Sequence, residues 1–175
     1  MMIREILTYP NPILRKKSHN VVKFDEELHT LLDDMYETML WHSGVGLAAI
    51  QVGLPLNVLI INIPNEDELQ DVSELIEAIN PKITHKEGIQ IFTEGCLSVP
   101  GFNEDVKRAQ HVVVEYFDRF GTLKTMEAEE FLAVAWQHEM EHLEGHLFIE
   151  KLSIIKRKKF EKEWKRKLKE ESKKA

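Results

Sequence analysis

Two histidines and a glutamate toward the C-terminal end of the chain have the types and spacing of a metal-binding motif. Residues 138–142 read His-Glu-Met-Glu-His, and positions i and i+4 of a helix lie on one face. The imidazoles of His138 and His142 can therefore point at one ion, and Glu139 lies near enough to move protons on a water molecule there. The alternative is a pair of histidines on a half-buried helix face, each satisfied by hydrogen bonds.

A catalytic ion of this type usually has three protein ligands and one open position. The chain has Phe148 where an HExxHxxGxxH pattern would place the third histidine. His146 follows the helix-ending Gly145 and is expected to face solvent, while spacing leaves a more distant glutamate open. Cys96 offers a thiolate, a strong ligand for a borderline metal, and Gly95 beside it permits close backbone approach. A lone cysteine otherwise packs as a small buried hydrophobe.

A glycine-rich segment supplies a further candidate residue. Residues 44–53 read Gly-Val-Gly-Leu-Ala-Ala-Ile-Gln-Val-Gly, and glycines permit tight turns and close approach of the backbone to a ligand. Gln51 carries an amide NH₂ group, which is suited to stabilising an oxyanion. As an isolated pattern, the segment also fits a plain loop in which Gln51 is a polar bystander.

Hydrophobic periodicity predicts the helices that must carry these residues. Apolar residues recur at helical spacing from Asp25 to Leu40, and Asp25 can cap the helix start. Residues 130–144 lack glycine and proline and end at Gly145, the usual residue just past a helix C-terminus. A last helix is expected from Ser153, with a sparse apolar face formed by Ile154, Ile155, Phe160, Trp164 and Leu168.

Short β-branched segments predict strands at residues 58–63, 79–85, 89–92 and 112–117. A turn at 118–121 makes residues 123–128 the hairpin partner of the last of these strands. Residues 64–78 are acidic and irregular, so we expect an exposed excursion there. The order helix, strands, helix, helix indicates the α+β class: short, mostly antiparallel strands around a central helix that bears the HExxH motif, plus a C-terminal helix.

Length and composition exclude several other classes of protein. The 175 residues suffice for one domain with its own core, and 43% hydrophobic with 30% charged residues is ordinary for a globular protein. The apolar runs are too short to span a bilayer, and the N-terminus lacks the apolar core of a signal peptide. The single cysteine forms no intrachain disulfide. We therefore expect a reducing, intracellular setting rather than a membrane protein, a secreted disulfide scaffold or a disordered chain.

The net charge of −7 hides an uneven distribution. Residues 1–150 carry 11 Lys and Arg against 26 Asp and Glu, whereas residues 151–175 carry 12 against 4. An acidic body therefore has a basic tail, which could contact an anionic partner such as RNA. The alternative is a solvated charged helix that aids solubility. The acidic body gives no reason to expect DNA binding.

Three segments together resemble the three motifs of the peptide deformylases. They are residues 44–51 (Gly-Val-Gly-Leu-Ala-Ala-Ile-Gln), 94–98 (Glu-Gly-Cys-Leu-Ser) and 137–143 (Gln-His-Glu-Met-Glu-His-Leu). Their order and spacing match the family, and the resemblance extends from about Ile3 to Ser153. Each motif alone is short, and the combination of all three makes the resemblance specific.

The resemblance implies a metal-dependent hydrolase that removes the formyl group from the N-terminal formyl-methionine of nascent polypeptides. It implies that Cys96, His138 and His142 hold the ion and that water takes the fourth position. The ion of the family is usually Fe²⁺ in the cell, and Zn²⁺, Ni²⁺ or Co²⁺ can substitute.

The same resemblance assigns roles around that ion. Glu139 is the general base and then the acid for the leaving amine, while Gln51 and the backbone N–H of Leu97 stabilise the oxyanion. Gly46 is expected to offer backbone hydrogen bonds to an extended substrate, in the manner of an added strand. The residues implied for the methionine pocket, each with plain core packing as the alternative, are Val45, Phe92, Phe131, Val134 and Ala135.

The resemblance also implies a division of the chain. Residues 1–153 would form the catalytic domain and residues 154–175 a basic C-terminal helical extension. Bacterial relatives with such a helix meet their substrate as it leaves the ribosome, so this extension is a candidate contact for ribosomal RNA. We expect a location in the bacterial cytoplasm, with neither DNA nor a membrane as a partner.

Two other functions compete with deformylation. An HExxH metallopeptidase that cuts internal peptide bonds would need another third ligand and would leave Cys96 without a role. A non-catalytic, ribosome-associated binding module would be indicated by a damaged motif, whereas the motif residues are all present.

Overall fold

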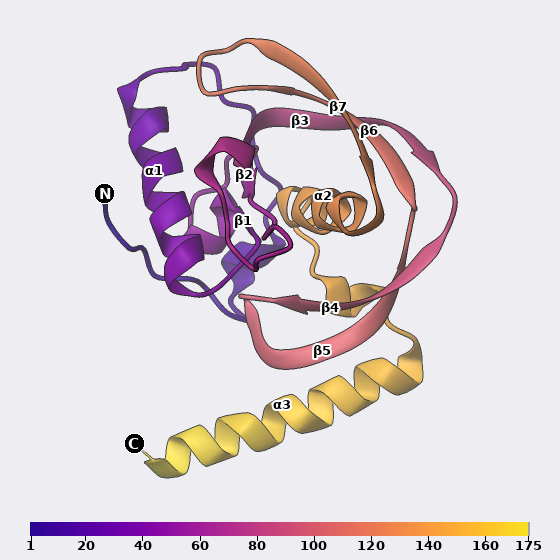
Figure 1. Cartoon of the computed structure of the whole chain (residues 1–175). Helices are drawn as coiled ribbons and strands as arrows, with labels where there is room; N and C mark the ends of the chain where they lie inside the picture. The colour runs from indigo at the N-terminus through magenta and orange to yellow at the C-terminus, as the bar shows by residue number, and fades with distance from the viewer. Residues whose placement is uncertain (175) are drawn as a thin grey trace.

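The computed structural model describes residues 1–174, which form three α-helices and seven β-strands (Figure 1). The helices are α1 (Glu26–Trp41), α2 (Glu130–Leu143) and α3 (Ile154–Lys174). The strands are β1 (Gly46–Ala48), β2 (Val58–Ile61), β3 (Ile76–Glu87), β4 (Gln90–Cys96), β5 (Val99–Arg108), β6 (His111–Phe117) and β7 (Leu123–Glu129). Short 3₁₀ turns occupy Pro12–Arg15, Ala49–Val52, Val72–Glu74 and Phe148–Lys151.

The strands form two antiparallel sheets that surround α2. The larger sheet has the order β1-β2-β3-β6-β7, and β4 pairs with β5 in a separate two-stranded sheet. Figure 1 shows α2 almost end-on at the centre, with β3, β6 and β7 above it and β4 and β5 below. This arrangement confirms the expected α+β fold with a central helix that bears the HExxH motif.

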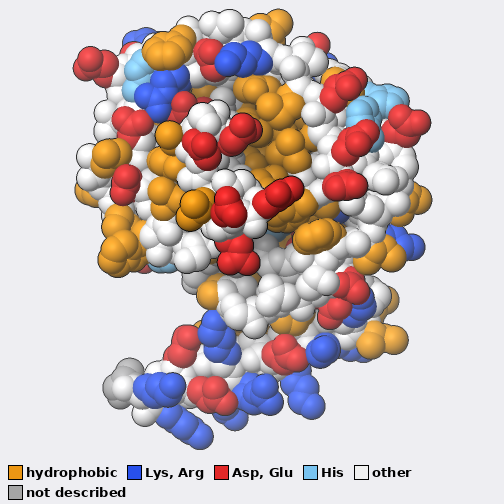
Figure 2. Space-filling view, in the orientation of Figure 1, with side chains coloured by type: hydrophobic (Ala, Val, Ile, Leu, Met, Phe, Trp, Pro, Cys, Tyr) orange, Lys and Arg blue, Asp and Glu red, His pale blue; other side chains and the backbone are white. Residues whose placement is uncertain are grey.

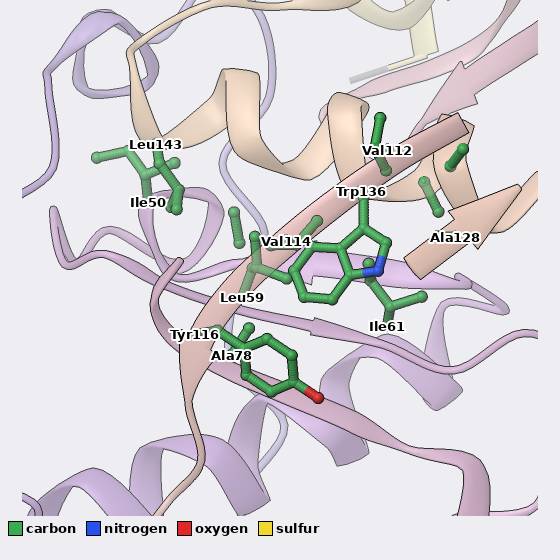
Figure 3. Packing of buried hydrophobic residues seen from close by; sticks show 13 residues of the cluster. Ile50, Leu59, Ile61, Ala78, Val112, Val114, Tyr116, Ala128, Trp136 and Leu143 are labelled. Atoms are coloured by element: carbon green, nitrogen blue, oxygen red, sulfur yellow. The ribbon is translucent and has the colours of Figure 1, made fainter. Parts of the chain in front are cut away.

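Helix α2 is buried because apolar side chains of the large sheet cover it. Trp136 is fully buried and its ring lies 5.4 Å from that of Tyr116 on β6. Figure 3 shows the Trp136 indole among Leu59 and Ile61 of β2 and Val114 of β6. Burying so many large side chains supplies the main driving force that fixes the helix, at about 1.5–3 kcal/mol for each. The metal-motif residues on α2 therefore stand on a rigid element.

Helix α1 packs against the other face of β1 and β2 through its apolar stripe, which includes Leu32, Met35 and Met39. The Asp25 side chain accepts a hydrogen bond from the backbone N–H of Leu28, as expected for an N-cap. This packing covers one face of β1. The outer edge of β1 is unpaired, since β1 is the end strand of the large sheet.

Helix α3 lies beneath the small sheet (Figure 1) and is anchored by two aromatic side chains. Phe160 and Trp164 are buried in a third cluster, where both contact the ring of Tyr9 and Phe160 also contacts Phe102 on β5. Lys167 donates a hydrogen bond to the carbonyl oxygen of Pro100 at 2.7 Å. Within residues 1–174, no helix is both long enough and apolar enough to cross a bilayer.

Several element predictions were incomplete or wrong. Strand β5 was not predicted, because Pro100, Gly101 and a buried Arg108 interrupt its apolar alternation. Residues 76–78 were assigned to the acidic excursion but begin β3, which is longer than expected. Of the apolar face predicted for the last helix, Ile154, Ile155 and Leu168 are exposed, and only the two aromatic residues pack.

Candidate metal centre and substrate cleft

Three potential metal ligands converge between α2 and the end of β4. His138 and His142 lie one helical turn apart on α2, and their Nε2 atoms are 3.2 Å from each other. The Sγ atom of Cys96, the last residue of β4, lies 3.3 Å from Nε2 of His142. These three residues form a group whose ligand atoms all lie within 4.8 Å of one another.

This geometry fits a tetrahedral metal site. Metal–nitrogen bonds of 2.0–2.1 Å and a metal–sulfur bond of 2.3 Å place two nitrogens about 3.3 Å apart and sulfur about 3.6 Å from nitrogen. The distances from His142 to Cys96 and to His138 are close to these values before any side chain moves. The donor set of two imidazoles and one thiolate suits Fe²⁺, Zn²⁺, Co²⁺ or Ni²⁺.

A buried carboxylate orients the first histidine. Glu94 on β4 is 2.9 Å from Nδ1 of His138, which leaves Nε2 of that ring directed at the ligand group. Arg108 on β5 donates two parallel hydrogen bonds to Glu94, at 2.7 and 2.8 Å, and a third to Glu141 on α2. This network joins both strands of the small sheet to the metal-motif helix.

The charges of the network determine its protonation. Burial raises the pKa of Glu94, but the hydrogen bonds and charges of Arg108 and His138 outweigh it, so the pKa lies below its usual value. Burial lowers the pKa of His142 well below its usual value, and the charges of His138 and Arg108 add to that effect. His142 therefore presents a neutral ring, the form that binds a metal ion.

Glu139 is buried against the backbone of β1. A Cβ atom added at Gly46 would lie 2.7 Å from its Oε1, so only glycine leaves room for this carboxylate. Its Oε2 is buried and has no hydrogen-bond partner among the described residues. Burial, aided by the charge of Glu94, raises the pKa of Glu139 to about 7, against the opposing charges of His138 and Arg108. A carboxylate with a pKa near neutrality is suited to both accept and donate a proton.

Gln51 is held with its amide group beside the sulfur atom of Cys96. Its Oε1 accepts a hydrogen bond from the backbone N–H of Ala48 at 2.9 Å, which fixes the orientation of the amide. Its Nε2 donates to Ser98 Oγ at 3.0 Å and lies 3.7 Å from Cys96 Sγ. Leu97 and Ser98 form the tight turn between β4 and β5, so both predicted oxyanion donors border the ligand group.

A cleft of about 520 Å³ opens onto this group. Its walls include Gln51, Cys96, Leu97, His138 and Glu139. The residues predicted to contact substrate all line the same cleft, namely Val45, Gly46, Phe92, Phe131, Val134 and Ala135. The rings of Phe92 and Phe131 are stacked, with centroids 5.0 Å apart, and form an apolar wall.

The sequence did not identify the residues that support the ligands. Glu94 and Ser98 were part of a quoted motif without a role, and a buried carboxylate two residues before a ligand could have been weighed as its orienting partner. Arg108 belongs to no motif, and only the pairing of β4 with β5 brings it beside Glu94. His146 is exposed, as expected, and it pairs with Glu150.

Comparison with protein families and curated proteins gives a consistent result. The family model described as polypeptide deformylase matches residues 3–158. A peptide deformylase of Campylobacter jejuni is 58% identical over 173 residues, covering 98% of this chain and 99% of the relative. A peptide deformylase of Nautilia profundicola is 55% identical over 174 residues, covering 99% and 100%.

Solved structures agree with the sequence relatives. A peptide deformylase from Legionella pneumophila superimposes with a TM-score of 0.89 at 40% identity, covering 99% of both chains. A peptide deformylase from Ehrlichia chaffeensis in complex with actinonin has a TM-score of 0.87 at 38% identity, covering 95% of this chain and 98% of that one.

Proposed function

This chain belongs to the polypeptide deformylase family, and from that premise we propose how its own residues perform the reaction. The reaction is the hydrolytic removal of the formyl group from the N-terminal formyl-methionine of nascent polypeptides. One observation carries the proposal: Cys96, His138 and His142 converge beside a cleft whose walls include Cys96, His138, Glu139 and Gln51.

The enzyme is metal-dependent, and we propose that Cys96, His138 and His142 hold a single divalent ion. Fe²⁺ is the ion proposed for the cell, with Zn²⁺, Ni²⁺ or Co²⁺ as substitutes, because the same donor set accepts all four. The bound ion would supply Lewis acidity, which brings the pKa of a water molecule from about 16 toward about 7. Glu94 keeps the His138 ring in the tautomer and orientation that such binding needs.

Glu139 is the proposed proton carrier. Its carboxylate accepts a proton from the attacking water and then delivers it to the nitrogen of the leaving methionine amine. Its burial and its pKa of about 7 support both roles at neutral pH. Gly46 allows the backbone of β1 to pass directly over this carboxylate, so the substrate amide can lie within its reach.

Gln51 and the backbone N–H of Leu97 are the proposed donors to the oxyanion that forms when water attacks the formyl carbon. The Gln51 amide is preorganised by Ala48 and Ser98, so little reorganisation accompanies the reaction. Its Nε2 also lies beside Cys96, one of the ligands. This position beside a ligand supports the proposed role of Gln51 as a donor to the oxyanion.

The substrate is proposed to lie along the free edge of β1. Gly46 on that edge offers backbone groups to an extended peptide, which would add to the sheet as a further strand. The methionine side chain then enters the apolar part of the cleft formed by Val45, Phe92, Phe131, Val134 and Ala135. Burial of the unbranched, apolar methionine side chain in this pocket would stabilise the bound substrate in proportion to the apolar area removed from water.

Residues 154–175 are proposed as an extension that contacts ribosomal RNA, and the bacterial cytoplasm is the proposed location. The support is charge: Lys and Arg side chains gather over α3 at the bottom of Figure 2, while acidic side chains are spread over the body above it. Clustered cations of this kind bind phosphate backbones.

Formate release from a formyl-methionine tripeptide tests the function directly. The protein is prepared without oxygen, because a cysteine ligand is prone to oxidation, and its metal content is determined. We expect formate release with about one metal ion per chain and no cleavage of the same tripeptide carrying acetyl in place of formyl. Cleavage of an internal peptide bond, or no formate despite a full metal complement, would contradict the proposal.

A further inference from the structure

A second group of potential ligands lies away from the cleft. His85 and Glu87 are on β3 and His111 is the first residue of β6, and none of the three lines the cleft that holds Cys96. Among residues 1–174, only this trio and the catalytic one bring three such donor atoms within 4.8 Å of one another. In Figure 2, histidine and acidic side chains lie together at the upper right, where Figure 1 draws β3 beside β6.

The register of the sheet places the three side chains on one face. Glu87 is the direct partner of His111 across the β3–β6 pair, and directly paired residues point to the same side. His85 precedes Glu87 by two residues and therefore shares that side. The Nε2 of His85 lies 3.5 Å from Oε2 of Glu87, and the two imidazole rings have centroids 6.2 Å apart.

An independent feature of His111 indicates a ligand. Its Nδ1 is shielded from solvent and has no hydrogen-bond partner among the described residues. A buried ring nitrogen without a partner is energetically unfavourable, and coordination to a metal ion would satisfy such an atom. The exposed pair His146 and Glu150, in contrast, consists of two groups that already satisfy each other.

The surrounding charges favour a cation. Glu129 on β7 is the direct partner of His111 on its other side, so a second carboxylate flanks the ring on the same face. Lys86 alternates to the opposite face of the sheet and does not compete for the site. The face therefore combines two imidazoles with two carboxylates.

We propose that His85, Glu87 and His111 form a second, peripheral site for a divalent transition-metal ion, separate from the catalytic one. Two imidazoles and a carboxylate are a ligand set that Zn²⁺ and similar ions accept, with remaining positions open to water. The ion would clamp β3 to β6 next to Gly88, where the chain leaves the large sheet for β4.

The site binds more weakly than the catalytic one. The side chains of His85 and Glu87 are 57% and 73% exposed, so ordering them costs conformational entropy. At the catalytic site His138 and His142 are buried and Cys96 is partly buried, and His142 already lies at metal-binding distance from both other ligands. We expect a dissociation constant in the micromolar range for Zn²⁺ at the peripheral site.

Zinc counting on untagged enzyme tests the proposal. Enzyme loaded with one Zn²⁺ per chain is equilibrated with buffered, micromolar free Zn²⁺, and bound zinc is measured together with the thermal midpoint. Wild type is expected to take up a second equivalent and to melt at higher temperature. His111→Ala and Glu87→Gln should lose the second equivalent and the thermal shift, while keeping the first equivalent and full formate release.

His146→Ala serves as the matched control, since it removes an exposed histidine that has a carboxylate partner but no third ligand. It should bind two equivalents, as wild type does. Glu87→Gln changes an exposed side chain without loss of volume, so it keeps the test valid if His111→Ala folds poorly. The proposal is overturned if wild type binds no second zinc below millimolar concentrations, or if both variants bind it unchanged.

Discussion

Glu139 shows how the reaction and the stability of this enzyme oppose each other at the level of one side chain. The carboxyl group is buried beside His138 and pressed against Gly46, where its charged form is poorly solvated. Its pKa of about 7 lies above the ordinary value of 4.5. The raised value suits proton transfer, but a carboxylate that must ionise in this place lowers the stability of the fold.

This conflict predicts an unusual stabilising substitution in the metal-free protein. Between pH 4.5 and about 7 the folded chain holds the Glu139 proton more tightly than the unfolded chain. The free energy of unfolding therefore falls as pH rises through this range, by up to about 3 kcal/mol. Glu139→Gln should remove this loss, so that the variant is the more stable protein at pH 8 and the difference is absent at pH 4.5.

Urea unfolding at the two pH values, with metal removed by a chelator, measures this effect. Identical pH dependence of wild type and Glu139→Gln would contradict the burial argument. Loss of the difference after metal is restored would be consistent with it, since a nearby cation favours the carboxylate.

Gln51→Ala isolates the oxyanion donor. The amide acts on charge that exists only after water attacks, so its removal should lower kcat by roughly 10²–10³ with little change in KM. Metal content should remain that of wild type, because Gln51 is not a ligand. Ser98→Ala, which removes only the anchor of the amide, should have a smaller effect. A change in KM alone would contradict an oxyanion role.

At this scale, short motifs made part of the site predictable. His138 and His142 are four residues apart on one helix, so their convergence follows from local geometry. Cys96 required the resemblance to a known family, since spacing alone left other third ligands open. The role of Arg108 could not be predicted, because it depends on the pairing of β4 with β5, which no local sequence pattern indicates.

At the scale of elements, the small sheet matters because it brings Cys96 and Glu94 to α2. Strand β5 was missed in the sequence because its inward positions include an arginine, which reads as a surface residue. The prediction of α2, β6 and β7 succeeded because local signals mark each of them. Helix α2 lacks glycine and proline and ends before Gly145, β6 is rich in β-branched residues, and the turn at 118–121 joins β7 to β6. The buried charge of Arg108 therefore made β5 hard to predict. The pairing of β5 with β4 is what brings Arg108 beside Glu94.

Arg108→Gln tests this support. The change leaves Glu94 buried without its cation, so the enzyme should lose about 3–5 kcal/mol of stability. Because Glu94 orients His138, metal affinity should also fall, by roughly 10–100-fold. Lys151→Gln is the matched control, since Lys151 is half exposed and contacts only Glu141 in the same network. Its stability should change by less than about 1 kcal/mol. Equal effects of the two substitutions would contradict the account.

Helix α3 is tied to the catalytic body more closely than its charge implied. Phe160 and Trp164 fill the cluster that includes Phe102, which lines the cleft. Removal of residues 156–175 would therefore expose apolar surface and disturb the rim of the cleft. A test of ribosome contact must leave both aromatic residues in place.

At the scale of the whole molecule, an acidic body carries a basic C-terminal helix, and an anionic partner such as ribosomal RNA would account for this distribution. Lys162, Lys165 and Lys169 are exposed on α3. Replacing all three with glutamine should weaken ribosome binding and reduce the slope of log affinity against log salt by about 2. Formate release from a short peptide should be unchanged, because none of the three lines the cleft. Unchanged ribosome affinity and salt dependence would refute the contact.

Some features of the whole molecule could be predicted from the sequence and others could not. Fold class and the three-motif centre could be predicted because they depend on periodicity and on short, specific patterns. The anchoring of α3 and the His85, Glu87 and His111 group could not, because both depend on contacts between segments far apart in the chain.

The central claim is that one metal ion held by Cys96, His138 and His142 works with Glu139 to hydrolyse the formyl amide. The most direct measurement compares anaerobically prepared wild type and Glu139→Gln for metal content and formate release from the same formyl-methionine tripeptide. We expect about one metal ion in each protein and almost no turnover in the variant. Wild-type turnover in a fully metal-loaded Glu139→Gln enzyme would contradict it.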